Sequence, residues 1–380
     1  MRFLFVAGGG AAPVHASVPL ASAARTAGHE VIVAAPEENL DLITGLGLPA
    51  RGVTALGMAD AMLKDREGNW LPMPTGEADE MDFGGRGFAR LSAAGLAGTL
   101  ELAEAWRPDV VIGGEYNLAG PLVAHKLGVP LVRHTWAIYD RTEVDWQGAT
   151  DELRPELAQF GLDAIPDAAL FVDITPPSVR PDHAEPAQAM RWTAGNPQTP
   201  LEPWMYTKGD RPRVLITSGS RSAFIPALGM DFFRPLLDNP LLNAGDIEVV
   251  VATGEPLAGQ IREAYPEIKA GFVPLDVIAP TLDLAVHHGG GVTVMTLLSA
   301  GVPQLVLPEI LASAIPLRRV DEYGATHTLA SHQEPPEEVA ADISKMLSDT
   351  SYRRRARDLA DEIAGLPAPA EVVKAIEALV

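Results

Sequence analysis

The chain of 380 residues contains no cysteine and comparatively few basic side chains. The absence of cysteine excludes disulfides, thiolate nucleophiles and cysteine-ligated metals, and it is typical of proteins of a reducing cytoplasm. The 29 Lys and Arg residues are outnumbered by 50 Asp and Glu, so the formal net charge is −21. Because nucleic acids and anionic membranes attract basic surfaces, neither is expected as a partner.

Long apolar runs are missing as well. An apolar stretch near residues 302–317 is interrupted by Pro303, Pro308 and Pro316. No run reaches the ~20 residues that span a bilayer. We therefore expect no transmembrane helix, and a location in the cytoplasm.

The N-terminal residues admit two interpretations. Arg2, an apolar run and small residues at 21–23 imitate a signal peptide. The same segment predicts a buried strand over 3–7, a turn at Gly8-Gly9-Gly10 and a helix ended by Gly28, with a second strand behind it. We expect the strand–helix–strand unit, because a cleaved peptide does not need one.

Hydrophobic residues make up 47% of the chain, with 35 Gly and 33 Pro. The length exceeds that of one ordinary domain and favours two. Buried strands followed by glycine-rich turns and helices recur, which predicts an α/β fold with parallel sheets covered on both faces. The candidate strands are 2–7, 30–35, 109–113, 131–134, 213–217, 248–252, 284–287 and 304–307.

The sequence repeats one pattern in its two halves. Asp109 opens a strand, and 21 positions later Pro130 opens the next; Asp283 and Pro303 do the same with a spacing of 20. Eight prolines between 176 and 212 predict an extended linker, because proline cannot donate to a ladder and resists helix interiors. We expect two similar halves, with the boundary near 205–211.

One motif indicates anion binding. In His287-His288-Gly289-Gly290-Gly291-Val292-Thr293, a strand leads through three glycines into a helix. Glycine lets the backbone approach a ligand closely, and the first-turn amides of a helix point outward without partners. His288 adds a donor. A protein of net charge −21 can thus hold an anion locally, without a basic patch.

The residues HHGGGVTVMTLLSAGVPQLVLPE resemble the donor-binding signature of GT-B, family 1 glycosyltransferases, which attach dTDP-deoxysugars to bacterial polyketide antibiotics. The motifs DREG, AWRPDVVIGG and DELRPEL look closest to the enzymes of aromatic polyketides of the urdamycin and landomycin (angucycline) type. The resemblance implies two Rossmann-like domains facing a cleft, with inverting chemistry and no metal or cofactor. An acceptor domain over 1–205, with linker 175–210, would precede a donor domain over 211–362 and a helix over 363–380 that returns to the first.

By resemblance, the donor site lies on the second domain. Residues after its first strand would line the cleft, two residues would border the base through main-chain contacts, and the glycine motif would hold the diphosphate. No Asp-x-Asp pair is available for a metal. The implied donor residues are Ser218, Gly219, Ser220, Val273, Leu275, His288, Gly290, Gly291, Val292 and Thr293.

Two positions depart from the pattern of the family's sugar site. Where many members carry Asp-Gln, this chain has Ala312 and Ser313. A sugar with fewer hydroxyls leaves fewer groups to satisfy, so we expect a deoxysugar such as olivose or rhodinose. The alternative is that other residues supply the missing contacts.

The sequence does not identify the catalytic base. Many members carry a histidine near the position of Pro13, and proline cannot be a base. His15 lies two residues on, about 200° around a helix, so it replaces that histidine only if the turn is irregular; otherwise it is a partly buried polar residue. Glu115 corresponds to a carboxylate that orients the base in relatives, or else it faces solvent.

A second candidate base follows the strand at 131–134. Some C-glycosylating relatives carry a carboxylate directly after Thr-Trp, where this chain has Ala137, and the nearest acids are Asp140, Glu143 and Asp145. A carboxylate or imidazole can deprotonate a phenol, which then attacks through oxygen or carbon. Asp140 and His15 are our candidates, with Glu115 in support, and the bond type stays open.

The acceptor is expected over the first domain. Segment 52–90 holds methionines and aromatics among Gly, Pro and acidic residues, which suits an adaptable apolar pocket or ordinary cover of the core. We take Trp70, Met81 and Trp136 as acceptor-binding residues. A nucleotide-sugar epimerase or hydrolase and a catalytically inactive helper protein are the alternative functions, and a homodimer stays open.

Overall fold

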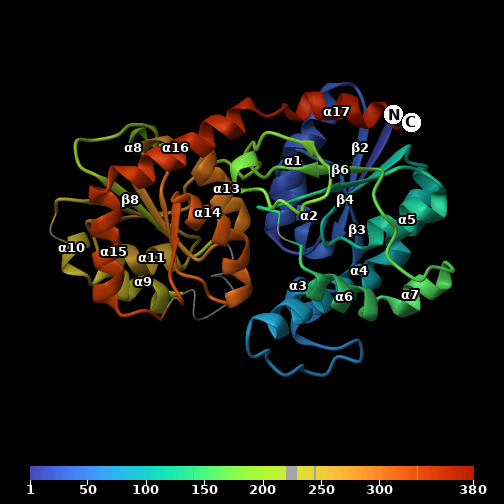
Figure 1. Ribbon diagram of the computed structural model, residues 1–380, viewed down its shortest axis with the longest axis horizontal. Coiled ribbons are helices and arrows are strands. Elements are labelled where there is room, and N and C mark those ends of the chain that lie inside the picture. The colour runs from blue at the N-terminus through green and yellow to red at the C-terminus, as the bar shows by residue number, and fades with distance from the viewer. Residues whose placement is uncertain (140, 220–228, 244, 332) are drawn as a thin grey trace. The chain divides into compact units, whose positions relative to one another are not determined.

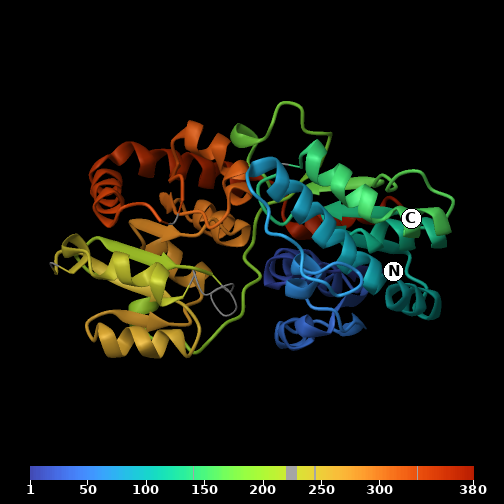
Figure 2. The same cartoon turned by 90° about the horizontal axis from the view of Figure 1, so that it is seen from below.

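The computed structural model describes residues 1–380 except 140, 220–228, 244 and 332. The chain forms two compact units, each an α/β layer structure with helices around a parallel sheet (Figures 1 and 2). Unit 1 comprises Met1–Thr175, Asp182–Gly195 and Leu366–Val380, and unit 2 comprises Pro176–Pro181 and Asn196–Gly365. The predicted α/β class with two Rossmann-like parallel sheets is confirmed.

The chain passes from unit 1 into the main part of unit 2 after Gly195, before the boundary expected near 205–211. The linker backbone is packed tightly against the first helix there, because a Cβ on Gly195 would lie 2.2 Å from the carbonyl oxygen of His15. Residues 182–195 of the proline-rich segment therefore belong to unit 1, while Pro176–Pro181 and the part from Asn196 onward belong to unit 2.

Unit 1 holds a seven-stranded parallel sheet of order β3-β2-β1-β4-β5-β6-β7 among its described residues. The strands are β1 (Arg2–Val6), β2 (Glu30–Pro36), β3 (Ala50–Thr54), β4 (Val110–Gly114), β5 (Leu131–His134), β6 (Leu170–Asp173) and β7 (Gln188–Ala189). The helices are α1 (Ala11–Thr26), α2 (Leu40–Gly45), α3 (Met58–Leu63), α4 (Glu77–Trp106), α5 (Ala119–Leu127), α6 (Glu143–Glu152), α7 (Arg154–Gln159) and α17 (Pro369–Glu377), with a 3-10 turn η1 (Glu37–Asn39).

Unit 2 holds a six-stranded parallel sheet of order β10-β9-β8-β11-β12-β13 in its described part. The strands are β8 (Arg213–Thr217), β9 (Glu248–Ala252), β10 (Lys269–Gly271), β11 (Leu284–His287), β12 (Gln304–Val306) and β13 (Thr326–Thr328). The helices are α8 (Pro203–Tyr206), α9 (Met230–Leu237), α10 (Pro240–Asn243), α11 (Leu257–Ala264), α12 (Leu275–Ile278), α13 (Gly291–Ser299), α14 (Arg318–Tyr323), α15 (Pro336–Ser348) and α16 (Thr350–Gly365); the 3-10 turns are η2 (Pro177–Val179), η5 (Ala279–Thr281) and η6 (Leu311–Leu317).

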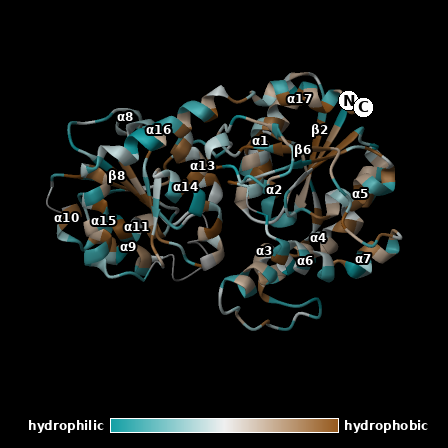
Figure 3. Ribbon diagram, viewed as in Figure 1, coloured by the Kyte–Doolittle hydropathy of each residue, from teal (hydrophilic) through white to brown (hydrophobic). Residues whose placement is uncertain are grey.

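The central strands carry the cores. β1, β4, β8 and β11 consist almost wholly of buried apolar residues, and they form the apolar centre of each unit in Figure 3. In unit 1, Leu4, Val6 and Val111 face α4 and α5 in one cluster. Their neighbours Phe5 and Ile112 point to the opposite face, which α1 covers. This alternation decides which side chains at the strand ends share a site.

The predicted internal repeat is present in the backbone. The Asp109 carboxylate accepts a hydrogen bond from the Arg2 amide at 2.7 Å, and Asp283 accepts one from the Arg213 amide at 2.8 Å. Gly128 and Gly301 end the following helices with φ of 66° and 70°. In each half, an aspartate thus ties the amino end of the first central strand to the strand beside it.

Asp283 is the stronger of the two ties. It is buried and also binds the Lys208 ammonium at 2.6 Å and the guanidinium of Arg353. We expect Asp283→Ala to lower the free energy of unfolding by about 2–3 kcal/mol, because it leaves the buried Arg213 amide without its acceptor and removes the hydrogen bonds to two half-exposed cations. Asp109→Ala removes the acceptor of one backbone amide, that of Arg2. It should lower the free energy of unfolding by about 1 kcal/mol. Urea unfolding measures both; equal losses would contradict this ranking.

Candidate functional site

The unit 2 strands present polar residues at their carboxyl ends, which meet at one edge of a parallel sheet. Ser218 and Gly219 follow β8, Thr253 follows β9, and His288 follows β11. Ser218 is fully buried and Thr253 is nearly so, yet neither hydroxyl oxygen has a hydrogen-bond partner in the protein. Buried hydroxyls are normally paired, so this edge has unused hydrogen-bonding capacity for a ligand.

Two glycines enclose the imidazole of His288. Gly219 has φ of +68°, and a Cβ there would lie 2.4 Å from His288 Cε1. A Cβ on Gly290 would lie 2.7 Å from His288 Nε2. No other amino acid fits either position without moving the ring. The two glycines therefore leave the space that the ring occupies at the start of α13.

His287 holds the same glycine loop through a hydrogen bond to its backbone. It is fully buried, and its Nδ1 accepts a hydrogen bond from the Gly289 amide at 3.0 Å. Its Nε2 therefore carries the hydrogen and donates to Gln304 Oε1 at 2.8 Å. Burial lowers the pKa of His287 to about 4, so the ring stays neutral and this tautomer is stable.

The N-terminus of α13 is open to a ligand. Gly290 is its N-cap and supplies no side chain, and the first intrahelical bond shown runs from the Val294 amide to the Gly290 carbonyl at 3.0 Å. The amides of Gly291, Val292 and Thr293 precede that bond, and they have no acceptor within the helix. The first turn carries no acid. The helix dipole and these amides favour an anion here.

The other predicted donor residues lie at or near this edge. The side chain of Val273 is buried in the core with Leu215 and Ile278, so only its main chain can face a ligand. Leu275 begins α12 and packs on the same cluster. Ser220 lies outside the described residues. Thr253 was missed, although a threonine directly after an apolar strand is a visible signal for this position.

The residues at the expected sugar positions offer little to a ligand. Ala312 has no polar side chain, and the Ser313 hydroxyl donates to the Ile310 carbonyl oxygen at 2.7 Å. Both residues belong to η6. The hydroxyl of Ser313 is thus used locally, within its own turn.

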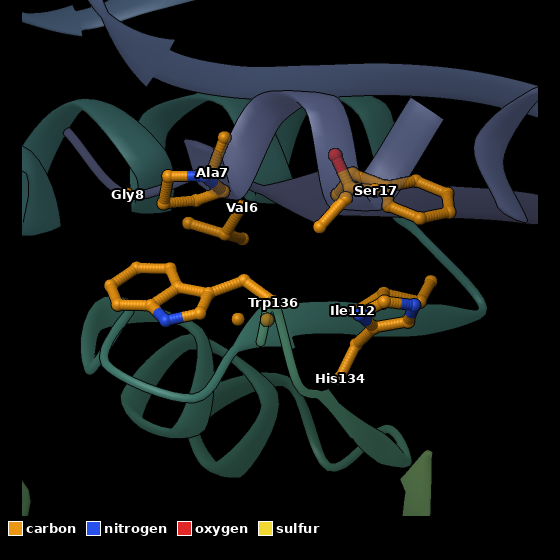
Figure 4. A pocket seen from close by; sticks show the side chains of 12 residues that line it. Val6, Ala7, Gly8, Ser17, Ile112, His134 and Trp136 are labelled. Atoms are coloured by element: carbon orange, nitrogen blue, oxygen red, sulfur yellow. The ribbon is translucent and has the colours of Figure 1, made fainter. Parts of the chain in front are cut away.

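Unit 1 has a pocket between α1 and its sheet, here named the α1 pocket. Its free volume of about 20 Å³ has room for one water-sized group. Figure 4 shows His134 and Trp136 on one wall, facing Ser17 on the other. The lining residues are Phe5, Val6, Ala7, Gly8, Pro13, Ala16, Ser17, Ile112, Gly113, Gly114, His134 and Trp136.

An aromatic cluster lies beside the α1 pocket. Phe88 stacks on Tyr116 with ring centroids 5.1 Å apart, and Trp136 lies 5.2 Å from Phe88 and 5.8 Å from Tyr116. Phe88 and Tyr116 also line a second apolar pocket under α4. The three rings come from α4 and from the loops after β4 and β5, so they form an aromatic wall at the carboxyl edge of the sheet.

Two buried carboxyl groups are next to Tyr116: Glu115 precedes it in the chain, and Asp145 binds its hydroxyl. Glu115 is 5% exposed, and burial raises its pKa to about 8, with Arg133 partly opposing the effect. The Tyr116 hydroxyl donates to Asp145, whose pKa is raised by burial. Burial and the Asp145 charge also raise the pKa of Tyr116. Glu115 does not face solvent, and at neutral pH it is mostly protonated.

The other two predicted catalytic residues are His15 and Asp140. Pro13, Ala16 and Ser17 of α1 line the α1 pocket, and His15 is not among the lining residues. The helix is regular from Ala11, so His15 points elsewhere; burial lowers its pKa to about 4. Asp140 lies outside the described residues.

The predicted acceptor residues in segment 52–90 do not line either pocket described above. Trp70 is 71% exposed, and the Lys64 ammonium lies 5.0 Å from its ring centroid. Met81 is partly buried on α4. Phe88 of this segment lines the second pocket. Met58 packs against the turn after β1, since a Cβ on Gly9 would lie 2.7 Å from its sulfur.

The described part of the chain holds no group of three or more His, Cys, Asp or Glu side chains placed to bind a metal. Among the described residues, no helix is long and apolar enough to cross a membrane.

The two domains of one protein family match two consecutive parts of the chain. The N-terminal domain of the erythromycin biosynthesis protein CIII-like family matches residues 79–219, and its C-terminal domain matches residues 236–379. The chain is 32% identical to an L-demethylnoviosyl transferase of Streptomyces niveus, over 100% of this chain and 98% of the relative. It is 28% identical to the elloramycin glycosyltransferase of Streptomyces olivaceus, over 98% and 96%.

A solved structure matches the whole fold. The glycosyltransferase SsfS6 of Streptomyces sp. SF2575, complexed with thymidine diphosphate, has a TM-score of 0.85 and 36% identity, covering 100% of this chain and 99% of that one. Its two α/β units are those of the GT-B fold predicted above. Sequence and structure agree that this chain is a glycosyltransferase and belongs to the erythromycin biosynthesis protein CIII-like family of antibiotic biosynthesis.

Proposed function

We propose that the chain transfers a deoxysugar from a dTDP donor to an aromatic polyketide of the angucycline type, with inversion at the anomeric carbon and without a metal ion. The observation that carries the donor assignment is the enclosure of His288 by Gly219 and Gly290 at the open N-terminus of α13. Amides and imidazole there can take up the charge of a leaving diphosphate. A relative of 36% identity is complexed with thymidine diphosphate.

The sugar and the acceptor follow from two further features. Ala312 and the internally bonded Ser313 leave few polar groups for a sugar, which supports one with fewer hydroxyls, of the olivose or rhodinose type. The wall of Phe88, Tyr116 and Trp136 suits a planar aromatic acceptor, because stacked rings bury large faces in a defined geometry. One direct displacement at the anomeric carbon inverts it.

Incubation with dTDP-olivose and a tetracyclic phenolic polyketide tests this function. We expect a product heavier by one deoxysugar in mass spectrometry, unchanged turnover in EDTA, and slower turnover with dTDP-glucose. Acid hydrolysis then separates a labile O-glycoside from a resistant C-glycoside. Equal or better turnover with dTDP-glucose would contradict the deoxysugar assignment, and free sugar formed without acceptor would indicate a hydrolase.

A further inference from the structure

His134 places a basic nitrogen in the α1 pocket. It ends β5 and is 4% exposed, and its Nε2 is buried with no hydrogen-bond partner in the protein. The register of the sheet directs it there: Ile112 pairs with Val132 and Gly114 with His134, and Ile112 and His134 line the same pocket. The side chain of Arg133, the residue before His134, points to the other face of the sheet. Its Cζ lies 4.2 Å from the Phe171 ring centroid.

The residues that the structure describes around His134 offer no hydrogen-bond donor to its Nε2, so the donor must come from a ligand. Among the twelve described residues that line the α1 pocket, His134 is the one with a titratable side chain. Ser17 supplies a hydroxyl, which donates to the Val14 carbonyl at 2.9 Å. The rest of the lining is apolar or backbone. An unpaired imidazole nitrogen facing such a pocket is stabilised by a ligand that brings its own O–H donor.

The His134 ring is neutral and can accept a hydrogen bond. Burial lowers the pKa of His134 to about 4, although backbone hydrogen bonds at Thr135 and His134 itself oppose the shift. The imidazole is therefore neutral at neutral pH, with one nitrogen available as an acceptor. The backbone around it is held in place, since the Thr135 amide donates to Val172 O at 3.1 Å and Thr135 Oγ1 accepts from the Ile174 amide at 3.2 Å.

The mouth of the pocket adjoins the aromatic wall. Trp136 belongs to both, and a Cβ on Gly8 would lie 3.7 Å from Pro13 Cγ and 4.0 Å from Trp136 Cζ3. A planar acceptor on the wall can therefore present a hydroxyl at this mouth. Pro13 lines the pocket without offering a proton acceptor, and His15 does not line it.

We propose that His134 is the catalytic base of the transfer reaction, an inference that rests on the proposed function. As the acceptor oxygen bonds to the anomeric carbon, its O–H bond breaks and the proton passes to His134 Nε2. The bond between the anomeric carbon and the diphosphate oxygen breaks, and its electron pair leaves with dTDP. The imidazolium then returns the proton to solvent.

The test uses full-length wild type, His134→Gln and His134→Ala, with His125→Gln, at an exposed histidine of α5 in the same unit, as the matched control. With dTDP-olivose and a phenolic polyketide, we expect kcat to fall by about 10²- to 10⁴-fold in both His134 variants. His125→Gln should stay within about 3-fold of wild type, on the same principle that only a positioned base contributes. Thymidine diphosphate should bind all four proteins equally, which reports an intact unit 2.

Two readouts separate a base from a merely structural residue. Added imidazole should restore part of the kcat of His134→Ala, and an acceptor with a more acidic phenol should lose less rate in His134→Gln. In wild type labelled with ¹⁵N-histidine, the Nε2 resonance of His134 should shift when the phenolic acceptor binds. Full kcat in His134→Gln, or a loss that neither imidazole nor the acidic phenol relieves, overturns the assignment. If wild type transfers no sugar, the proposed function fails first and the base assignment with it.

Discussion

Alanine at Gly219 is expected to disable the donor site. Its Cβ would lie 2.4 Å from His288 Cε1, and φ of +68° adds strain for any residue with a side chain. The imidazole must move by roughly 1 Å, and a misplacement of that size costs on the order of 100-fold in rate. We expect Gly219→Ala to bind thymidine diphosphate weakly in calorimetry and to lower kcat/KM for the dTDP-sugar by at least about that factor.

Gly128→Ala is the matched control. Gly128 has nearly the same φ, 66°, but nothing lies within 4 Å of its Cβ position. It should lose about 1 kcal/mol of stability, with unchanged affinity for thymidine diphosphate. Gly290→Ala, which meets His288 without a positive φ, should behave like Gly219→Ala. If Gly219→Ala folds and binds thymidine diphosphate normally, the enclosure of His288 has no role in donor binding.

Glu115→Gln is expected to change how stability depends on pH. The pKa of Glu115 is raised from 4.5 to about 8 by burial, so the folded state binds the proton more tightly than the unfolded state. Its contribution to stability is complete below pH ~4.5, and it is lost as pH rises to ~8 and beyond. The loss amounts to a few kcal/mol when both states are ionised. Glutamine has the shape of the neutral acid and removes the loss.

Thermal unfolding across pH 5–9 measures the effect. The Tm of wild type should fall relative to that of Glu115→Gln as pH rises, with the smallest difference at pH 5. Glu101→Gln, an exposed carboxylate on α4 of the same unit, should follow wild type at every pH. Parallel Tm curves for wild type and Glu115→Gln would show that Glu115 is ionised in the folded protein.

The central strands of both sheets were predictable, because they are apolar throughout. β1, β2, β4, β5, β8, β9, β11 and β12 match the eight predicted strands. The five others were missed, and four of them, β3, β7, β10 and β13, lie at sheet edges. An edge strand is short and half exposed, so its residues lack a continuous apolar run.

The glycine loop between β11 and α13 was predictable for a different reason. Glycines between a buried strand and a helix have few structural explanations besides close backbone approach. The role of His287 was not visible, because the sequence does not say which of two adjacent histidines points into the core. That depends on the register of β11 against β12, which brings Gln304 within 2.8 Å of one ring.

The α1 pocket was harder to predict for the same physical reason. His134 ends an apolar strand, and the face to which it points follows from pairing with β4 and from the helix that covers that face. Neither is encoded locally. The acceptor role of Trp70 stays a prediction. Its ring is exposed, the Lys64 ammonium lies over it, and the two residues form an isolated bridge.

The composition of unit 1 has a consequence for protein synthesis. Its α17 packs on α1 and buries Val372, Val373 and Ile376, while Glu377 binds His29 at 2.8 Å. On the ribosome, residues 366–380 emerge only after all of unit 2 has been made. The nascent chain must therefore hold α1 without its covering helix while unit 2 folds. The unit that is translated first is completed last.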